Sequence, residues 1–447
     1  MRPTRRAVTF GLAAALAPWS ARGEGGFTLT AAPVRRKLHP DAAGEAEAWR
    51  LGEEAAPVLR LPHGRALRVQ FRNGLERPLA LHWHGVRGPN AVDGVGGLTQ
   101  EPVAPGASFE YRFTPPDPGV FLIRPVVLGA SAEPQERGLV GALVVEEPDP
   151  PPAEADHVLI VDDLLLAEDG DFAPFDDVMR AATLGRLGNR LVVDGAPVPK
   201  RLEAPAGARL RLRLLNACNA RLLGLRFEGL KVAVLGIDGQ PAARFEPLHA
   251  TLPFAPGTRY DLLVEAPDGA GRILAALGDG VELVAIGPAA GAAKPAPPLG
   301  RPVPNPRLPE AIRLEAATRR DLVIAGGAQR KGDAFVVEGD PRRLWTVNGA
   351  SGSLDTPLLR VKRGTPVVLR IVNRTPAPQV LHVHGHAFRR LHAFDDGWEP
   401  YWLDTVVAPD ARPVQIAFVA DNPGRWLIAS TVLERFDTGL WTWFEVS

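Results

Sequence analysis

The sequence of 447 residues is informative first in what it lacks. It contains one cysteine, Cys218, so it forms no intramolecular disulfide. Its 51 basic residues balance its 51 acidic residues, which gives no electrostatic reason to expect nucleic acid or an anionic membrane as a partner. No run of about 18 apolar residues is present, so we expect a protein that does not span a membrane.

What is present is a repeated pattern of glycine, asparagine and histidine. In segments 64–84 and 364–384, a glycine is followed by an asparagine nine residues later and by a His-x-His pair nine residues after that. Segment 207–227 has the same spacing, but Leu225 and Phe227 stand where the histidines are expected. Self-similarity of this kind indicates a repeated domain. We therefore expect three copies of one domain, of which only the outer two carry the histidine pair.

The two pairs, His82 with His84 and His382 with His384, are the candidate metal ligands. Alternate residues of a strand point to the same face, so each pair can direct two imidazoles at one point. Imidazole is a good ligand for copper, zinc or iron. We expect the strands of the outer copies to meet there, with the rings of His82 and His382 well within ~15 Å of each other, since a metal–nitrogen bond is only ~2 Å long.

Short apolar and β-branched runs alternate with turn residues throughout, and helical periodicity is scarce. This pattern predicts an all-β protein of three consecutive Greek-key β-sandwich domains. The repeats place the domains at 26–148, 154–288 and 310–447, with a proline-rich linker at 289–309 that we expect to cross the surface in an extended form.

The first 25 residues have the features of a cleaved export signal. Arg5 and Arg6 precede a weakly apolar run at 7–17, which is too short to span a bilayer. The arginine pair and the Ala/Gly-rich run favour a twin-arginine signal. The alternative is an ordinary secretory signal with two chance arginines. Both predict export, and we expect the periplasm of a Gram-negative cell.

These features together resemble the multicopper oxidase family, the laccases and their bacterial relatives. The resemblance rests on the threefold repeat, the export signal and the histidine motifs at 82–85 and 382–386, and it covers essentially the whole chain after the signal. Segment 93–100 resembles the loop after the first histidine pair of laccases, and 404–406 and 422–424 resemble landmarks of their last domain. The resemblance implies three cupredoxin-like domains and copper as the cofactor.

Most copper ligands of the family have no counterpart in this chain. The resemblance implies four coppers held by ten histidines and one cysteine, of which only the histidines at 82, 84, 382 and 384 match. Blue copper needs a cysteine thiolate and usually a weak axial methionine, but Cys218 lies in the middle copy, where we expect it to fill the core, and the only methionines are Met1 and Met179. The residues that stand at the remaining ligand positions are Arg124-Pro125-Val126, Gln379, Ala429-Ser430-Thr431, Arg435 and, at the axial position, Trp441.

The four histidines that match family ligands predict at most one bound copper. The resemblance assigns His82 and His382 as the intact pair, with His84 or His384 as further ligands, Asp93 holding a bound water and His386 behind the ligands. The alternative is that the site binds no metal and that the four neutral imidazoles have only a packing role. Arg124 either places a cation in the old copper cavity or reaches solvent. Trp441 either fills the vacated blue-copper cavity or belongs to the core.

Two classes of function therefore stay open. One is an exported copper protein with weak or no oxidase activity, which, if it is an enzyme, is a copper-dependent oxidoreductase and not a standard laccase. The other is a non-enzymatic periplasmic scaffold or cell-envelope protein, similar to the copper-free division protein of this family. That protein shares the signal, the length and the ligand loss, but the present chain keeps both histidine pairs. We expect a monomer, with a periplasmic protein as the possible partner in the scaffold case.

Overall fold

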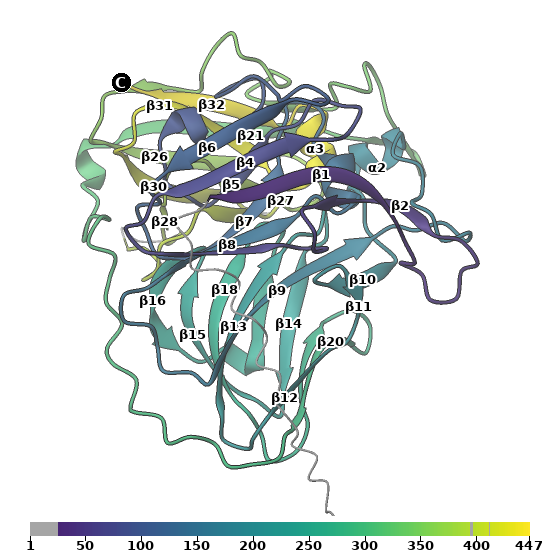
Figure 1. Cartoon of the computed structure of the whole chain (residues 1–447). Helices are drawn as coiled ribbons and strands as arrows, with labels where there is room; N and C mark the ends of the chain where they lie inside the picture. Colours follow the sequence, from purple (N-terminus) through teal and green to yellow (C-terminus); the bar gives the residue numbers. More distant parts are fainter. Residues whose placement is uncertain (1–25, 394–396, 411) are drawn as a thin grey trace, which may run out of the picture.

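The protein is built almost entirely from strands (Figure 1). This computed structural model describes residues 26–393, 397–410 and 412–447, so the expected export signal at 1–25 lies outside the described residues. Within the described part, no helix is long and apolar enough to cross a membrane. The helical elements are short turns between strands: α1 (Ala132–Glu136), α2 (Val178–Ala182), α3 (Leu433–Asp437), η1 (Asn90–Val92), η2 (Leu248–Ala250) and η3 (Leu314–Ala316).

The first sandwich packs a sheet of strand order β2-β1-β4-β6 against a sheet of order β3-β8-β7-β5. Alternating apolar residues of both sheets meet in one core. The strands are β1 (Phe27–Arg36), β2 (Ala46–Leu51), β3 (Val58–Pro62), β4 (Leu67–Asn73), β5 (Leu81–His84), β6 (Ser108–Phe113), β7 (Gly119–Pro125) and β8 (Gly141–Glu146).

The middle sandwich packs the order β11-β10-β9-β13-β18-β15-β16 against β12-β20-β19-β14-β17. Leu225 and Phe227 of β14 lie in its core, which explains how this copy tolerates the loss of the histidine pair. The strands are β9 (Ala155–Leu164), β10 (Arg190–Val193), β11 (Ala196–Pro197), β12 (Lys200–Ala204), β13 (Arg209–Asn216), β14 (Leu223–Glu228), β15 (Lys231–Ile237), β16 (Gln240–Phe245), β17 (Thr251–Phe254), β18 (Arg259–Glu265), β19 (Gly271–Ala275) and β20 (Val281–Pro288).

The third sandwich packs the order β24-β21-β26-β30-β28 against β25-β32-β31-β27-β29, and β22 pairs with β23 in a separate hairpin. The strands are β21 (Thr318–Gly326), β22 (Gln329–Lys331), β23 (Ala334–Val336), β24 (Trp345–Val347), β25 (Arg360–Val361), β26 (Thr365–Asn373), β27 (Gln379–Val383), β28 (Arg389–Arg390), β29 (Thr405–Ala408), β30 (Val414–Ala420), β31 (Gly424–Ser430) and β32 (Trp441–Val446).

All three sandwiches share one strand topology. In each, the first strand pairs parallel with the strand that carries the repeated asparagine, and a parallel pair also lies at the edge of the second sheet.

The hydrogen bonds of the repeated asparagine explain why the same spacing recurs in all three copies. In each copy its side-chain amide donates to two backbone carbonyls, and its side-chain oxygen accepts from the amide two residues further on. Each asparagine thus stabilises the turn that precedes the strand in which the outer copies carry the histidine pair.

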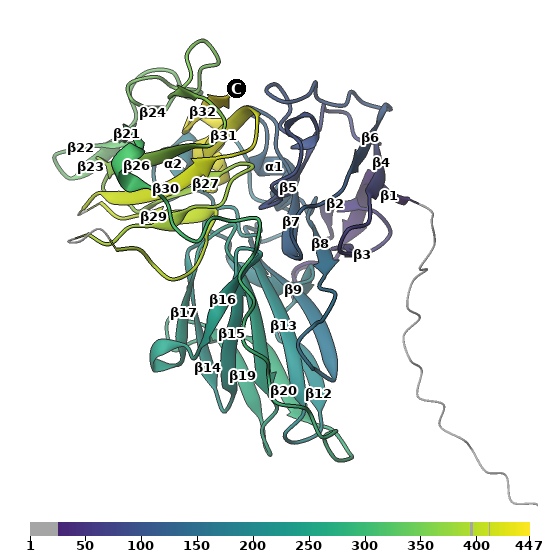
Figure 2. The same cartoon turned by 90° about the vertical axis from the view of Figure 1, so that its left-hand side faces the viewer.

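The first and third sandwiches stand side by side on top of the middle one (Figure 2). Residues 289–309 form no strand and run along the outside of the middle sandwich (Figure 1). Asn305 of this segment donates to Asp117 in the first sandwich and to Gln240 in the middle one, both at 2.8 Å. The segment therefore contributes hydrogen bonds that link two sandwiches.

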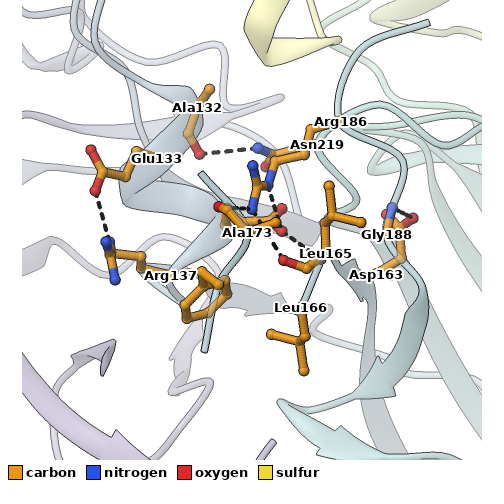
Figure 3. Close-up of polar contacts among 12 residues, drawn as sticks. Ala132, Glu133, Arg137, Asp163, Leu165, Leu166, Ala173, Arg186, Gly188 and Asn219 are labelled. Carbon is orange, nitrogen blue, oxygen red and sulfur yellow. Dashed lines mark hydrogen bonds and ion pairs between the residues drawn. The ribbon is translucent and has the colours of Figure 1, made fainter. Parts of the chain in front are cut away.

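A buried polar joint connects the first sandwich to the middle one around α1 (Figure 3). The guanidinium of Arg186 donates to the backbone carbonyls of Leu165 and Ala173. Its Nε atom also lies 2.9 Å from a carboxylate oxygen of Glu136, and both side chains are buried. Asn219, also of the middle sandwich, donates to the carbonyl of Ala132. Because buried polar groups are costly unless they are hydrogen-bonded, these bonds hold the sandwiches in one orientation.

Candidate metal centre

Strands β5 and β27 bring the two predicted histidine pairs together between the first and third sandwiches. The rings of His82 and His382 lie 5.6 Å apart between centroids, which confirms the expectation that the two strands meet. The pairs are interleaved: His82 stacks on His384 at 4.1 Å, and His84 stacks on His382 at 3.7 Å. All four side chains are almost completely buried. The structure therefore places all four candidate ligands in one cluster.

His82 and His382 are held in matching ways. The Nδ1 atom of His82 lies 2.7 Å from the backbone carbonyl oxygen of Asp93, and that of His382 lies 3.0 Å from the carbonyl oxygen of Asp404. A carbonyl only accepts, so each Nδ1 carries the proton and donates it. The buried Nε2 atoms of both rings have no hydrogen-bond partner among the described residues. Each ring therefore presents a free lone pair, which is the tautomer that metal-binding histidines adopt when the other nitrogen donates to the protein.

The side chain of Asp93 binds the histidines directly. Its carboxylate accepts a hydrogen bond from Nδ1 of His384 at 2.9 Å and lies 3.4 Å from Nδ1 of His82. Burial acts to raise the pKa of Asp93, but the interactions with His384 and His82 outweigh it and hold the pKa well below its usual range. Asp93 is thus an ionised carboxylate that orients two rings, a contact that the water-holding role predicted from the sequence did not include.

Arg259 of the middle sandwich reaches the same cluster, which the sequence analysis did not predict. Its guanidinium binds both carboxylate oxygens of Asp404 and donates to the backbone carbonyl of Gly257. Asp404 was noticed only as a landmark of the last domain, and Arg259 carried no signal at all. Through Asp404, whose carbonyl accepts from His382, the middle sandwich helps to position a candidate ligand.

Burial favours the neutral form of three histidines of the cluster. Burial, followed by repulsion from His82 and other charges, lowers the pKa of His384 to about 3, and burial also lowers the pKa values of His84 and His382. Imidazole must be neutral to bind a metal. His84, His382 and His384 are therefore in their ligand form at neutral pH.

A glycine of the middle sandwich allows close approach to His84. Gly257 has φ of +88°, and a Cβ atom at this position would lie 2.9 Å from the His84 ring. Both the left-handed backbone and the lack of space therefore favour glycine. Gly257 belongs to one of the Pro-Gly turns that precede a strand in the repeat.

The nitrogen atoms of the cluster suit one metal ion. His82, His84 and His382 each offer a ligand atom, and these atoms lie within 4.8 Å of one another. Two nitrogens on opposite sides of a metal are about 4 Å apart, given bonds of ~2 Å. The three rings must therefore move closer together to bind one ion. A second group of three, His82, Asp93 and His384, also lies within this limit but shares His82. The donor set therefore fits one ion of a metal that prefers imidazole, such as copper.

A cavity of about 10 Å³ lies beside the four histidines, close to the size that one water requires. Arg124 lines this cavity and is 4% exposed, so its side chain enters the cluster and does not reach solvent. In the sheet register, His82 of β5 faces Arg124 of β7, while His382 of β27 faces Ala429 of β31. A cation in the first sandwich thus corresponds to a methyl group in the third.

The position that the resemblance gives to the blue copper is occupied by a polar side-chain pair. Arg435 Nη1 donates to the side-chain oxygen of Gln379 at 2.7 Å, and its other nitrogens donate to the backbone carbonyl of Thr183. Of the two alternatives for Trp441, the structure favours the core. Trp441 lies in an apolar cluster with Val95, Val126, Leu427, Ala429, Phe436 and Trp443.

Other residues that the sequence analysis singled out lie as expected from their patterns. Cys218 is buried in the core of the middle sandwich. His386 is buried behind the cluster, with Nδ1 3.1 Å from the carbonyl oxygen of His384 and its ring packed against Trp426. Histidines outside the cluster contact other parts of the protein, as His63 does with the carbonyl of Pro116 and His39 with Arg190.

Three β-sandwiches of one topology, with a buried histidine cluster between the first and the third, define a copper-oxidase class of protein. Comparisons with known proteins agree. Sequence profiles described as "Multicopper oxidase" match residues 36–150 and 328–447. The multicopper oxidase MmcO of Mycobacterium tuberculosis is 28% identical, over 96% of this chain and 89% of that protein.

Solved structures extend the similarity over all three sandwiches. A multi-copper oxidase from Pseudomonas parafulva is 30% identical, covers 94% of this chain and 100% of its own, and superposes with a TM-score of 0.81. One from Pseudomonas thermotolerans is 29% identical, with coverages of 95% and 99% and a TM-score of 0.83. The chain belongs to the multicopper oxidase family.

Proposed function

We propose that this chain is an exported, periplasmic member of the multicopper oxidase family that binds at most one copper between its first and third sandwiches. His82 and His382 hold the ion, with His84 as the third ligand and His384 beside them. The observation that carries this proposal is the pair of buried Nε2 atoms without hydrogen-bond partners, each on a ring whose Nδ1 donates to a backbone carbonyl.

Such a site has a restricted chemistry. Bound copper supplies a centre for single-electron exchange and for polarising a ligand. The Arg435–Gln379 hydrogen bond occupies the position assigned to the blue copper, and Arg124 occupies that of another family ligand. We infer weak or no oxidase activity, because no described residues form a second histidine cluster through which electrons enter.

Copper titration tests this proposal. Chelator-treated protein is titrated with copper and followed by calorimetry, metal analysis and EPR. We expect about one copper per chain, loss of binding in His82→Ala/His382→Ala, and a weaker loss of about 10–100-fold in His386→Ala, because His386 contacts the ligands only indirectly. Equal uptake by the wild type and the double variant contradicts the proposal.

The second candidate function is a periplasmic scaffold without an enzymatic role. One observation favours it: the unpaired guanidinium of Arg124 faces the histidine cluster and repels a dication at short range. Arg124→Gln distinguishes the two functions in the same titration. Copper affinity that rises in this variant supports a weakened copper site, whereas no binding in either protein supports the scaffold.

A further inference from the structure

Arg124 is a buried cation without a hydrogen-bond or salt-bridge partner among the described residues. Its side chain is 4% exposed, its Nε atom has no hydrogen-bond partner, and within the described residues it forms no salt bridge. Burial of an ionised group without a partner is strongly unfavourable. A group of this kind therefore indicates a ligand that completes it.

Other buried arginines of this chain do have carboxylate or carbonyl partners, although single nitrogens of Arg186 and Arg213 also lack a hydrogen bond. Arg259 binds the carboxylate of Asp404 at two points, and Arg213 binds that of Asp156. Arg435, which lacks a carboxylate in contact, still donates to three neutral oxygen acceptors. The lack of partners at Arg124 is thus specific to its position and is not how the protein generally buries arginine.

The carboxylates nearest to this region are already bound elsewhere. Asp93 accepts from His384, and Asp437 accepts from the backbone amides of Ser131 and Ala132 at 2.8–2.9 Å. Asp437 interacts electrostatically with Arg124, but no hydrogen bond joins the two side chains. Neither carboxylate therefore serves as a contact counter-ion.

The cavity beside Arg124 has the size and the donors for one small anion. It measures about 10 Å³ and is lined by the four histidines of the candidate metal centre, by Arg124 and by Thr431, whose buried hydroxyl also has no partner. A guanidinium and a hydroxyl both donate hydrogen bonds, so they suit an acceptor of negative charge. The apolar part of the lining, Val126, Leu427 and Phe436, excludes larger polyatomic anions.

We propose that a small monovalent anion of halide size binds in this cavity, held by the guanidinium of Arg124 and the hydroxyl of Thr431. The site requires no metal, but it shares the lining histidines with the proposed copper site, so the anion is tested in metal-free protein. Chloride is the physiological representative of this class, and bromide is the probe, because it scatters X-rays anomalously.

The test uses the metal-free full-length protein. Crystals are soaked in sodium bromide, and thermal unfolding is followed against sodium bromide or sodium gluconate at equal ionic strength. We expect one anomalous peak beside Arg124 and a saturable, halide-specific rise in Tm. In Arg124→Gln the halide affinity should fall by about 10-fold or more, because charge-assisted hydrogen bonds contribute on this scale.

Arg360→Gln is the matched control, since Arg360 forms an exposed ion pair with Glu445 and should respond to halide like the wild type. If Arg124→Gln does not fold, the bromide peak in the wild type and Thr431→Val, which removes only the hydroxyl, decide the question. A cavity that holds water alone in bromide, or a halide response unchanged in Arg124→Gln, overturns the proposal. Metal analysis and EPR detect copper, whereas the anomalous peak detects bromide, so the two proposals fail separately.

Discussion

Arg259 of the middle sandwich and Asp404 of the third form a buried ion pair with two hydrogen bonds, Nη1–Oδ1 at 2.9 Å and Nη2–Oδ2 at 2.5 Å. Burial raises the pKa of neighbouring Asp238 to about 7, whereas the contact with Arg259 helps to hold the pKa of Asp404 well below its usual range. The cation thus selects one of two buried carboxylates to remain ionised, and the carbonyl of that residue orients His382.

Arg259→Gln should destabilise the metal-free protein by about 3–5 kcal/mol, because it leaves the carboxylate of Asp404 buried without a cation. Urea unfolding measures this loss, and copper titration should show a weaker site in the same variant. The exposed pair Arg360–Glu445 provides the control, since Arg360→Gln should cost only about 0–1 kcal/mol. Equal losses in the two variants would show that the buried pair has no special role.

Gly257→Ala should weaken copper binding, because its methyl group would displace the ring of His84. The control is Gly64→Ala: Gly64 also has positive φ, +82°, but a Cβ there meets nothing within 4 Å. Both variants should lose about 1–3 kcal/mol of stability through backbone strain. Only Gly257→Ala should lose copper affinity in calorimetry, and a parallel loss in Gly64→Ala would contradict the steric explanation.

The copper-loaded protein should show no intense blue absorption. That colour needs a copper–thiolate bond, and the one cysteine is buried in the core of the middle sandwich. Oxidation of phenols should be absent or marginal for the same reason, as measured by oxygen uptake after free copper is removed. A strong thiolate band, or robust turnover that survives this removal, would show that the copper site has been placed wrongly.

Glu136→Gln should change how stability depends on pH. Burial raises the pKa of Glu136 to about 8, despite the opposing attraction of Arg186. The folded state therefore binds more protons than the unfolded state between about pH 4.5 and 8. The contribution of Glu136 to the free energy of unfolding falls as pH rises through this window, by up to ~1.4 kcal/mol per pH unit. Glutamine mimics the protonated form and lacks this decline.

Urea unfolding of both proteins at pH 5 and at pH 8 measures the effect. The variant should gain stability relative to the wild type at pH 8, compared with pH 5. A difference between the two proteins that does not change with pH would mean that Glu136 is ionised in the folded protein, with Arg186 as its full counter-ion.

Spacing along the chain was sufficient to predict the sandwiches and the histidine cluster. The nine-residue intervals around Asn73, Asn216 and Asn373 reflect a turn that each asparagine ties with the same local hydrogen bonds. Strand geometry then places His82 and His84 on one face, as it does His382 and His384. These features depend on residues close in sequence, so a single sequence reveals them.

The sequence identifies which residues stand at the positions that the resemblance assigns to copper ligands. It does not predict what those side chains contact. Arg435 and Gln379 were both expected at ligand positions because of the resemblance, but their mutual hydrogen bond follows from how β27 and α3 pack. Side-chain rotamers in a core depend on all neighbours at once, and the sequence does not give those neighbours.

The sequence by itself determined that three copies of one β-sandwich would form and that the two members of each histidine pair would share one strand face, because local periodicity sets both. Only the tertiary structure decided the protonation pattern of the rings, the contribution of Arg259 and the isolation of Arg124. Each of these depends on burial and on partners far apart in the chain, such as Arg259 and Asp404, and burial without a partner is what turns Arg124 from an ordinary arginine into a candidate anion site.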